Sequence, residues 1–364
     1  MHPTQSMLRD ILAHFAIEGH LLSLKLHREG HINTTFFSTF EHEGSLYRYT
    51  HQKINTEAFK DPVSLMQNIS AVTSHIRGKL EGRYSDIDQR VLTVIPTRDG
   101  QLLFEDAEGG FWRTYRYIDQ VQTYNTIESE EQAYLFGAAV GTFQLQLADF
   151  DGSSLSHTIP RFHDMRLRYE QLQEAMQVNH HSRMALIADE LAFLEENKSR
   201  GCVLTDALRE GRLPLRVTHN DTKVNNVLFS LDGSEALCII DLDTVMPGTI
   251  LFDTGDMLRT GSNTGEEDTI DLNRVDCAVP LHRALLSGYR SKATFLTALE
   301  EELLVESGRT ITQIMAVRFL TDYLNGDVYY HIEREQHNLD RARTQIALMQ
   351  AMDRRWGELI KGGA

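Results

Sequence analysis

Apolar and polar residues alternate with a period of two along most of the chain between residues 20 and 118. A period of two is typical of strands with one buried face. The breaks between the runs carry Gly or acidic residues, in the segments REGH, EHEG, TRDG and AEGG. Such breaks are typical of hairpin turns, so the pattern predicts a largely antiparallel sheet.

One segment within this region has a helical period instead. Its apolar residues recur at spacings of four, three and four, at Leu65, Ile69, Val72 and Ile76. This spacing predicts an amphipathic helix inserted after the third strand. Asp61 and Pro62 suit the N-cap and the first helical position.

After Asn125 the chain becomes mostly helical, with segments at 128–150, 160–200 and 280–360. An island of strand pattern interrupts the helices, in the segments LRVTH, NVLFS and ALCIIDLD. The sequence therefore predicts an α+β fold with two lobes. Residues 1–118 form a small antiparallel β-rich lobe and residues 119–364 a large, mainly helical lobe.

Composition narrows the classes of protein that fit. The chain has 364 residues, more than one hydrophobic core usually serves, and a net charge of −16, which disfavours binding to nucleic acid. It has three cysteines, no apolar run long enough for a membrane span and no signal-peptide pattern at its start. We expect a cytoplasmic protein, a monomer or weak homo-oligomer, whose partners are small molecules.

The segment VTHNDTKVNNVLF, residues 217–229, concentrates polar groups between two predicted strands. Asn and Asp are common in turns because they bond their own backbone, so a polar turn is one interpretation. The other is a catalytic loop, because His219, Asp221 and Asn226 have the H-x-D-x-x-x-x-N spacing of kinases. In that loop the Asp orients or deprotonates the acceptor hydroxyl and the Asn holds a metal ion.

The hairpin that follows strengthens the catalytic interpretation. A two-stranded ribbon brings its ends together, so Asn226 and Asp241 could share one Mg²⁺. Asp221, Asp241 and Asp243 would crowd together, and two like charges about 4 Å apart repel by about 4 kcal/mol at an effective dielectric of about 20. A bound cation removes this cost. Lys223 would lie near the transferring phosphoryl group and balance its charge.

The chain resembles a known family in these stretches and in two later ones. They are THNDTKVNNVLF, IIDLDTVMPGTILFDTGDMLR, RFLTDYLNGDVYY and HNLDRARTQ. They are similar to the aminoglycoside phosphotransferase/choline kinase-like family of the protein-kinase-like fold, and within it to the N-acetylhexosamine 1-kinases. The resemblance implies transfer of a phosphoryl group from ATP, with Mg²⁺, to the anomeric C1 hydroxyl of GlcNAc or GalNAc.

The resemblance also implies roles for individual residues. Asp221 is the catalytic base, and Asn226 and Asp241 are metal ligands. Asp253 matches an Asp that braces the catalytic loop from behind. His219 matches a residue that orients the loop rather than one that carries a proton.

The nucleotide side departs from protein kinases. Their G-x-G-x-x-G loop is absent, and Gly30 is the only glycine between the first two strands. Backbone N–H groups at 31–34 could contact phosphates, although a plain hairpin turn fits equally. The D-F-G position reads Asp241-Leu242-Asp243, so we expect no glycine-dependent switch and a permanently assembled site.

The third strand should carry the lysine that pairs the nucleotide phosphates. Alternation allows only one of Gln52 and Lys53 to face the nucleotide, and charge favours Lys53. The Glu that pairs this lysine in kinases has no counterpart within residues 63–80. The hinge that would bond adenine through its backbone corresponds to Arg116, Tyr117 and Ile118, whose aromatic neighbours could equally be core.

The helical lobe should recognise the acceptor. The candidates that resemble acceptor-binding positions are Asp256, Arg259, Tyr323, Asp327 and Arg341. Arg341 and Arg343 point in different directions on a helix, so at most one should reach the ligand. Alternatives are a surface salt bridge for any of these residues, a kinase for choline, homoserine or an aminoglycoside, and a catalytically silent nucleotide-binding regulator.

Overall fold

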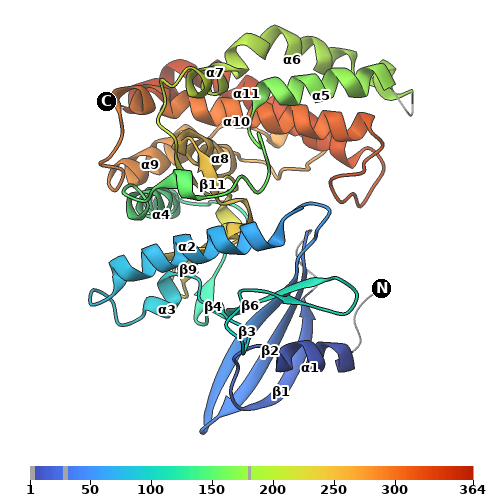
Figure 1. The fold of residues 1–364 in the computed structure, drawn as a ribbon. Coiled ribbons are helices and arrows are strands. Elements are labelled where there is room, and N and C mark those ends of the chain that lie inside the picture. The colour runs from blue at the N-terminus through green and yellow to red at the C-terminus, as the bar shows by residue number, and fades with distance from the viewer. Residues whose placement is uncertain (1–4, 28–31, 179–181, 364) are drawn as a thin grey trace.

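The computed structural model describes residues 5–27, 32–178 and 182–363. It confirms the predicted α+β class, with an antiparallel sheet in the N-terminal part and helices in most of the remainder (Figure 1). Gly30 and His31 lie outside the described residues. The boundary placed at residue 118 stays a prediction.

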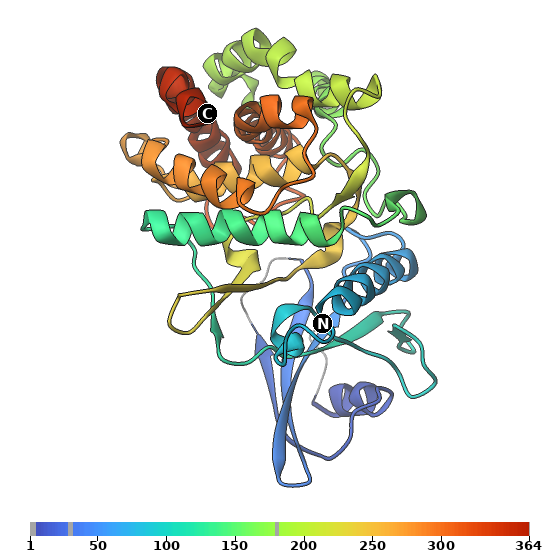
Figure 2. The same ribbon diagram turned by 90° about the vertical axis from the view of Figure 1, so that its left-hand side faces the viewer.

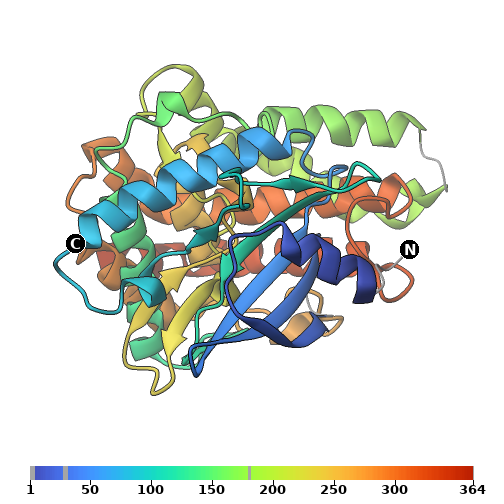
Figure 3. The ribbon, with the colours of Figure 1, turned by 60° about the horizontal axis from the view of Figure 1, so that its bottom comes forward.

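The N-terminal sheet has the strand order β1-β2-β3-β6-β4, and β5 also pairs with β6. Its strands are β1 (His20–His27), β2 (Thr34–His42), β3 (Ser45–Lys53), β4 (Val94–Ile95), β5 (Phe104–Glu105) and β6 (Phe111–Arg116). Every pairing is antiparallel, as the hairpin breaks predict. Figure 3 shows this twisted sheet from the side that carries α1.

The two faces of the sheet have different cores. Helix α1 (Gln5–Ala13) packs on one face, where Phe36, Tyr49 and Trp112 are buried with its apolar side chains. The other face contacts α2 (Pro62–Leu80), because the side chains of Arg113 and Tyr115 reach the sulfur of Met66. The orientation of a side chain on β3 or β6 therefore decides which of two environments it enters.

Helix α2 agrees with its sequence pattern. Asp61 is its N-cap and accepts a hydrogen bond from the backbone N–H of Ser64 at 3.0 Å. All four predicted apolar positions are buried. Asn68 is also buried and donates to the backbone oxygens of Ser156 and Val245, so α2 is attached to the helical part as well as to the sheet.

The helical part begins after β7 (Val121–Gln122). Its α-helices are α4 (Glu130–Gln146), α5 (Met165–Val178), α6 (Ala188–Gly201), α7 (Val203–Arg209), α8 (Ile250–Ser262), α9 (Val279–Arg290), α10 (Ala298–Leu324) and α11 (His337–Leu359). A short helix, α3 (Ile87–Arg90), lies between α2 and β4. In the described residues no helix is long and apolar enough to span a bilayer.

Glycines let α4 and α9 pack very closely. A Cβ atom at Gly137 would lie 2.0 Å from the backbone oxygen of Leu285, and one at Gly288 would lie 1.9 Å from that of Tyr134. Any larger residue would force the two helices apart. Figure 2 shows α4 in green along the lower edge of the helical part.

Two small antiparallel ribbons complete the helical part. Strand β8 (Arg216–Thr218) pairs with β11 (Met246–Gly248), and β9 (Val227–Ser230) pairs with β10 (Ala236–Ile239). Strand β7 adds to the outer side of β9, so the chain leaving the N-terminal sheet joins this ribbon. The predicted polar loop lies between β8 and β9.

Candidate active site

The loop between β8 and β9 is held by His219. Its Nδ1 accepts a hydrogen bond from the backbone N–H of Asp221 at 3.2 Å, and its Nε2 lies 2.9 Å from the backbone oxygen of Ile240. These partners require the tautomer with the proton on Nε2. His219 therefore orients Asp221, in agreement with the role implied by its sequence position.

Asp253 braces the same loop from α8. Its Oδ1 accepts from the backbone N–H of Asn220 at 2.7 Å, and its Oδ2 accepts from that of His219 at 3.0 Å. The hydroxyl of Thr222 donates to its backbone oxygen at 2.6 Å. The carboxylate thus fixes the backbone on which Asp221 is mounted.

A second layer supports this brace and was missed by the sequence analysis. Gln144 of α4 donates through Nε2 to Asp253 Oδ2 at 3.1 Å, and Tyr289 of α9 donates its hydroxyl proton to Gln144 Oε1 at 2.6 Å. The available signal was a glutamine inside the apolar run of α4, because a buried polar group needs a partner.

We expect Asp253→Asn to lower turnover at least about tenfold and to destabilise the fold by about 1–3 kcal/mol. The new amide group would face a backbone N–H, so a donor would oppose a donor. Steady-state kinetics and thermal unfolding measure the two effects. Asp151→Asn is the matched control, because Asp151 also accepts a backbone N–H but at an exposed turn. Wild-type turnover in Asp253→Asn would contradict the bracing role.

The ribbon brings Asn226 and Asp241 to the same end, as its topology requires. The backbone N–H of Ile240, adjacent to Asp241, donates to the backbone oxygen of Asn226 at 2.9 Å. The amide nitrogen of Asn226 donates to Asp221 Oδ2 at 3.1 Å, which leaves its amide oxygen for another partner. Asp241 has a left-handed backbone with φ of 63°, a strained conformation that recurs at functional sites.

The electrostatics at Asp241 fit a cation. Asp241 is exposed, but the protein atoms packed around it and the charges of Asp243 and Asp221 raise its pKa to about 6. An amide oxygen and a carboxylate are ligands that Mg²⁺ takes when phosphates and water complete its coordination. The described residues contain no cluster of three or more His, Cys, Asp or Glu side chains arranged for a metal, and a two-ligand site needs none.

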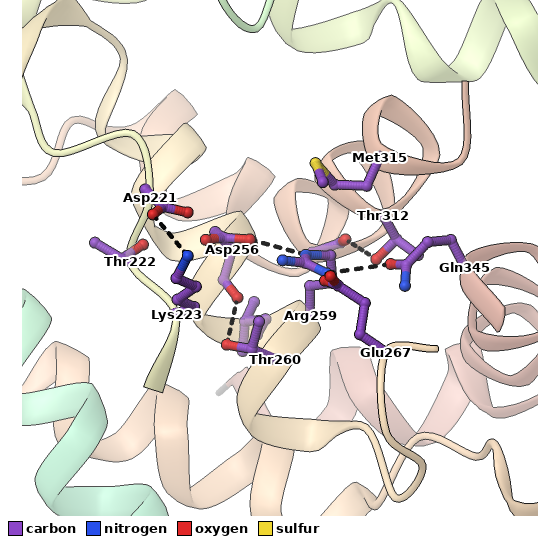
Figure 4. A network of polar contacts seen from close by, with 12 residues as sticks. Asp221, Thr222, Lys223, Asp256, Arg259, Thr260, Glu267, Thr312, Met315 and Gln345 are labelled. Atoms are coloured by element: carbon purple, nitrogen blue, oxygen red, sulfur yellow. Dashed lines mark hydrogen bonds and ion pairs between the residues drawn. The ribbon is translucent and has the colours of Figure 1, made fainter. Parts of the chain in front are cut away.

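Lys223 pairs directly with Asp221. Its Nζ lies 3.0 Å from Asp221 Oδ2 (Figure 4). Burial alone raises the pKa of Asp221, but Lys223, His219 and Arg259 lower it overall. Asp221 in turn raises the pKa of Lys223. The carboxylate is therefore ionised at neutral pH and the cation stands beside it.

A polar network centred on the buried Arg259 of α8 continues from this pair (Figure 4). Arg259 donates to Asp256 Oδ1 at 2.8 Å, to Glu267 Oε2 at 2.6 Å and to Gln345 Oε1 at 3.3 Å. Asp221 is among the charges that raise the pKa of Asp256, after burial as the main cause. The structure thus gathers Asp256 and Arg259 near Asp221, and adds Glu267 and Gln345, which the sequence analysis missed.

The other acceptor candidates lie in two places, one near Glu267 and one in the turn after α10. Arg341 is among the cations that lower the pKa of Glu267, so it belongs to the same neighbourhood, whereas Arg343 pairs with Glu190 on α6. Tyr323 is fully buried, and Asp327 pairs with Arg183 at 2.6 Å. Asp327 also accepts from Asn338 at 2.9 Å, and Asn338 accepts from Arg341 at 3.2 Å, so within the described residues Asp327 reaches this neighbourhood through Asn338. The direct contacts of Asp327 stabilise the turn after α10.

On the nucleotide side, the expected orientation of Lys53 is wrong. Lys53 pairs in register with Trp112 on the face that carries α1, and its Nζ lies 3.3 Å from Asp106 Oδ2. Its neighbour Gln52 is on the opposite face, where its Oε1 accepts from Nε of Arg113 at 2.9 Å. On the face of the sheet that is directed at α2 and Asp243, β3 therefore presents the neutral Gln52 and not Lys53.

We expect Lys53→Met to change the KM for ATP by less than about twofold, because a partly exposed ion pair contributes little. The measurement is initial velocity against ATP concentration. Gln52→Met, which alters the neighbouring residue on the opposite face, is the comparison. A large rise in the KM for ATP in Lys53→Met alone would show that Lys53 reaches the nucleotide after all.

At the predicted hinge, two of the three residues are already bonded. The N–H of Arg116 donates to Thr93 and that of Tyr117 donates to Arg48. The backbone of Ile118 makes no hydrogen bond within the described part of the chain. Its side chain packs with Leu228 and Cys238 on one face of the β9–β10 ribbon. Of the three backbone N–H groups, that of Ile118 is the one left for a ligand in the described part of the chain.

Asp253 holds the loop that carries Asp221, and the β9–β10 ribbon brings Asn226 and Asp241 to the same end. In an α+β fold this arrangement is typical of a kinase-like phosphotransferase. Comparison with known proteins agrees: the sequence profile of the phosphotransferase enzyme family matches residues 79–287, more than half of the chain. The protein belongs to this family.

Solved structures share the fold over nearly the whole chain. An aminoglycoside phosphotransferase from Alicyclobacillus acidocaldarius has a TM-score of 0.60 and 12% identity, covering 97% of this chain and 94% of its own. A spectinomycin phosphotransferase in complex with ADP and spectinomycin has a TM-score of 0.56 and 13% identity, covering 95% of this chain and 98% of its own. Choline kinase from Streptococcus pneumoniae has a TM-score of 0.52 and 13% identity, covering 91% of this chain and 94% of its own. These similarities extend the kinase-like fold to the N-terminal sheet.

Proposed function

We propose that the protein transfers the γ-phosphoryl group of ATP to the C1 hydroxyl of an N-acetylhexosamine such as GlcNAc or GalNAc. Membership of the phosphotransferase family supports the reaction, and the spectinomycin enzyme bound to ADP supports an adenine nucleotide. The residues around Glu267 support the acceptor, as follows.

The choice of acceptor is supported mainly by polar atoms near Glu267 that have no hydrogen-bond partner. Arg341 Nε, Gln345 Nε2 and the hydroxyl of Tyr330 are buried and make no hydrogen bond within the described residues. Gln345 shares Nη1 of Arg259 with Glu267, and Glu267 acts on the pKa of Tyr330. Buried donors without partners are rare in folded proteins, so such a group points to a ligand.

The chemistry of these atoms favours a neutral, oxygen-rich molecule. Two are N–H donors, which need acceptor oxygens, and an acetamido carbonyl or a sugar oxygen supplies them. The carboxylates of Asp256 and Glu267 can accept from sugar hydroxyls. Specificity of this kind is strong, because an analogue that lacks the oxygen leaves buried donors unpaired.

The local charge disfavours cationic acceptors. Lys223, Arg259 and Arg341 surround Glu267 closely enough to lower its pKa, although burial alone raises it. Arg318 of α10 is close enough to Asp221 for that carboxylate to raise the pKa of the guanidinium, which burial alone lowers. Lys223 and Arg259 pair with Asp221, Asp256 and Glu267, so Arg318 and Arg341 are the cations that a positively charged acceptor such as choline would meet, whereas a neutral sugar would meet no repulsion.

The reaction follows from the positions of Asp221 and Lys223. The acceptor hydroxyl donates its hydrogen bond to Asp221, its oxygen forms a bond to the γ-phosphorus, and the bond from that phosphorus to the β,γ-bridging oxygen breaks. The hydroxyl proton passes to Asp221 and ADP departs. Lys223 neutralises charge on the transferring group. Positioning and charge neutralisation supply most of the rate in such transfers.

Asn226 and Asp241 would hold Mg²⁺, which when bound neutralises the charge on the phosphates. Ile118 would hydrogen-bond adenine through its backbone, and Leu228 of β9 would pack against the ring. The partly buried Ile240 belongs to the same apolar group as these two residues. This assignment places the adenine at the hinge and the phosphates toward Asp241.

The test is a panel of acceptors in an assay of ADP release. GlcNAc and GalNAc should give the highest kcat/KM, glucose and galactose much lower values, and the methyl glycosides of both N-acetylhexosamines none, because their C1 oxygen is blocked. Gln345→Leu should reduce the preference for the N-acetyl sugars over the parent sugars. Highest activity with choline or an aminoglycoside would overturn the sugar assignment, and nucleotide binding without turnover on any acceptor would indicate a silent regulator.

A further inference from the structure

Arg113 carries a buried charge from the N-terminal sheet into the helical part. It lies on β6, and its Nη1 and Nη2 bind Oδ1 and Oδ2 of Asp243 at 2.5 and 2.9 Å. The two side chains are 2% and 5% exposed. Asp243 belongs to the 3₁₀ turn Leu242–Thr244, directly after Asp241. Both carboxylate oxygens of Asp243 are therefore bound by Arg113, which offsets part of the negative charge beside Asp241.

Further contacts hold this ion pair. Nε of Arg113 donates to Gln52 Oε1 at 2.9 Å, and the Gln52 amide donates to the hydroxyl of Thr35 at 3.1 Å. Asn33 donates through Nδ2 to Asp243 Oδ2 at 2.7 Å and accepts from the backbone of Asn55 at 3.0 Å. Strands β2, β3 and β6 thus all connect to one turn of the helical part.

The same turn presents Asp241. That residue has the left-handed backbone, with φ of 63° and ψ of 56°, which is unfavourable for a residue with a Cβ. Such a conformation persists only where surrounding contacts impose it. Anchoring Asp243 two residues later supplies one of these contacts, and it comes from the opposite part of the molecule.

No lysine–glutamate pair of the protein-kinase type can form on this face of β3. Position 52 on this face is Gln, and helix α2 has no acidic residue. Protein kinases use a β3 lysine paired with a helix glutamate to assemble the nucleotide site. In this protein the buried cation on this face comes from the next strand, and its carboxylate partner is in the metal-binding turn.

We propose that Arg113 is a positioning residue for phosphoryl transfer: through Asp243 it fixes the turn that presents Asp241, and it joins the N-terminal sheet to the helical part. This inference rests on the proposed role of Asp241 as a metal ligand. It does not depend on the identity of the acceptor.

The test separates positioning from folding. Removing one partner leaves an unpaired buried charge and is expected to destabilise the fold, whereas replacing both partners by neutral groups is often tolerated. The informative variant is therefore Arg113→Met/Asp243→Asn. Its thermal stability should be close to that of the wild type, while its affinity for the non-hydrolysable ATP analogue AMP-PNP with Mg²⁺ falls about 10- to 100-fold.

The measurement is calorimetric titration with AMP-PNP, with and without Mg²⁺. Affinity without Mg²⁺ should change little, because the lost interaction acts through Asp241. Arg113→Lys gives a second reading that keeps the charge but loses the two-pronged geometry, and it should also lower Mg²⁺-dependent affinity. The matched control is Arg90→Met/Glu235→Gln, since that pair also joins α3 to the β9–β10 turn but lies at the far end of the ribbon.

The outcomes distinguish the two proposals. Wild-type Mg²⁺-dependent affinity in both Arg113 variants would overturn the positioning role alone, and so would an equal loss in the Arg90/Glu235 control. Absence of Mg²⁺-dependent nucleotide binding in the wild type would overturn the proposed function and this inference together. Failure of every sugar in the acceptor panel would leave the titration result unaffected.

Discussion

Asp221→Asn should fold normally and lose about 10²- to 10⁴-fold in turnover, the range that a positioned acid–base group contributes. The amide keeps the shape of the carboxylate but cannot take the acceptor proton, and it no longer offsets the charge of Lys223 at 3.0 Å. The decisive measurements are kcat with the best acceptor of the panel, thermal unfolding and AMP-PNP affinity. We expect only the first to change greatly.

The control for this variant is Asp232→Asn, at the turn between β9 and β10. Asp232 accepts from the exposed backbone N–H of Ser234, at the end of the ribbon opposite the catalytic loop. Its substitution should leave kcat near the wild-type value. Turnover of Asp221→Asn at the wild-type level would remove Asp221 from the mechanism.

Asp241→Asn should have opposite effects on activity and on stability. Activity should fall on the order of 10³-fold, because a metal ion contributes several kcal/mol of charge stabilisation in the transition state. The folded protein without Mg²⁺ should become more stable at pH 8, because the substitution removes a carboxylate that is repelled by Asp221 and Asp243. Thermal unfolding with excess EDTA measures the stability effect.

The pH dependence of this stability effect has a definite sign. The pKa of Asp241 is raised to about 6 in the folded protein from an ordinary value of 3.8, so the folded state binds the proton more tightly than the unfolded chain does. The wild type therefore loses stability as pH rises from about 4 through 6. The gain from Asp241→Asn should be full above about pH 7 and vanish near pH 4. A stability gain that does not depend on pH would exclude charge repulsion as its cause.

Local patterns predicted the elements that carry the site. The four apolar positions of α2 and its Asp61 cap follow from short-range rules, and the structure agrees with both. The turns EHEG and AEGG join paired antiparallel strands as predicted, whereas β4 and β5, on either side of TRDG, each pair with β6 and not with each other. The ribbon that joins Asn226 to the neighbourhood of Asp241 was predictable as well, because a hairpin leaves its two ends adjacent whatever surrounds it.

The face of a strand was not predictable in the same way. Alternation states that Gln52 and Lys53 point in opposite directions, but it does not say which direction leads to the nucleotide. The register with β6 decides this, because it places Lys53 beside Trp112 and Gln52 beside Arg113. Such pairing joins residues about 60 positions apart, and no short window of sequence contains it.

The acceptor side shows the same limit. Asp256 and Arg259 are one helical turn apart, so their proximity is local, whereas Gln345 reaches Arg259 from α11. Tyr323 and Asp327 are polar residues in a distinctive segment, yet their neighbours Arg183 and Asn338 engage them in stabilising the turn after α10. Residue type alone does not separate a ligand contact from a structural one.

The glycine contact between α4 and α9 has a consequence for how this protein can evolve. Gly288 and Tyr289 are adjacent, so the distance between the two helices also sets where the Tyr289 hydroxyl meets Gln144, and through it Asp253. A single methyl group added at position 288 would push the helices apart and so disturb the contacts from Tyr289 through Gln144 to Asp253, without touching any ligand. Selection for activity should therefore also act on the contact between α4 and α9, although neither helix supplies a reactive group.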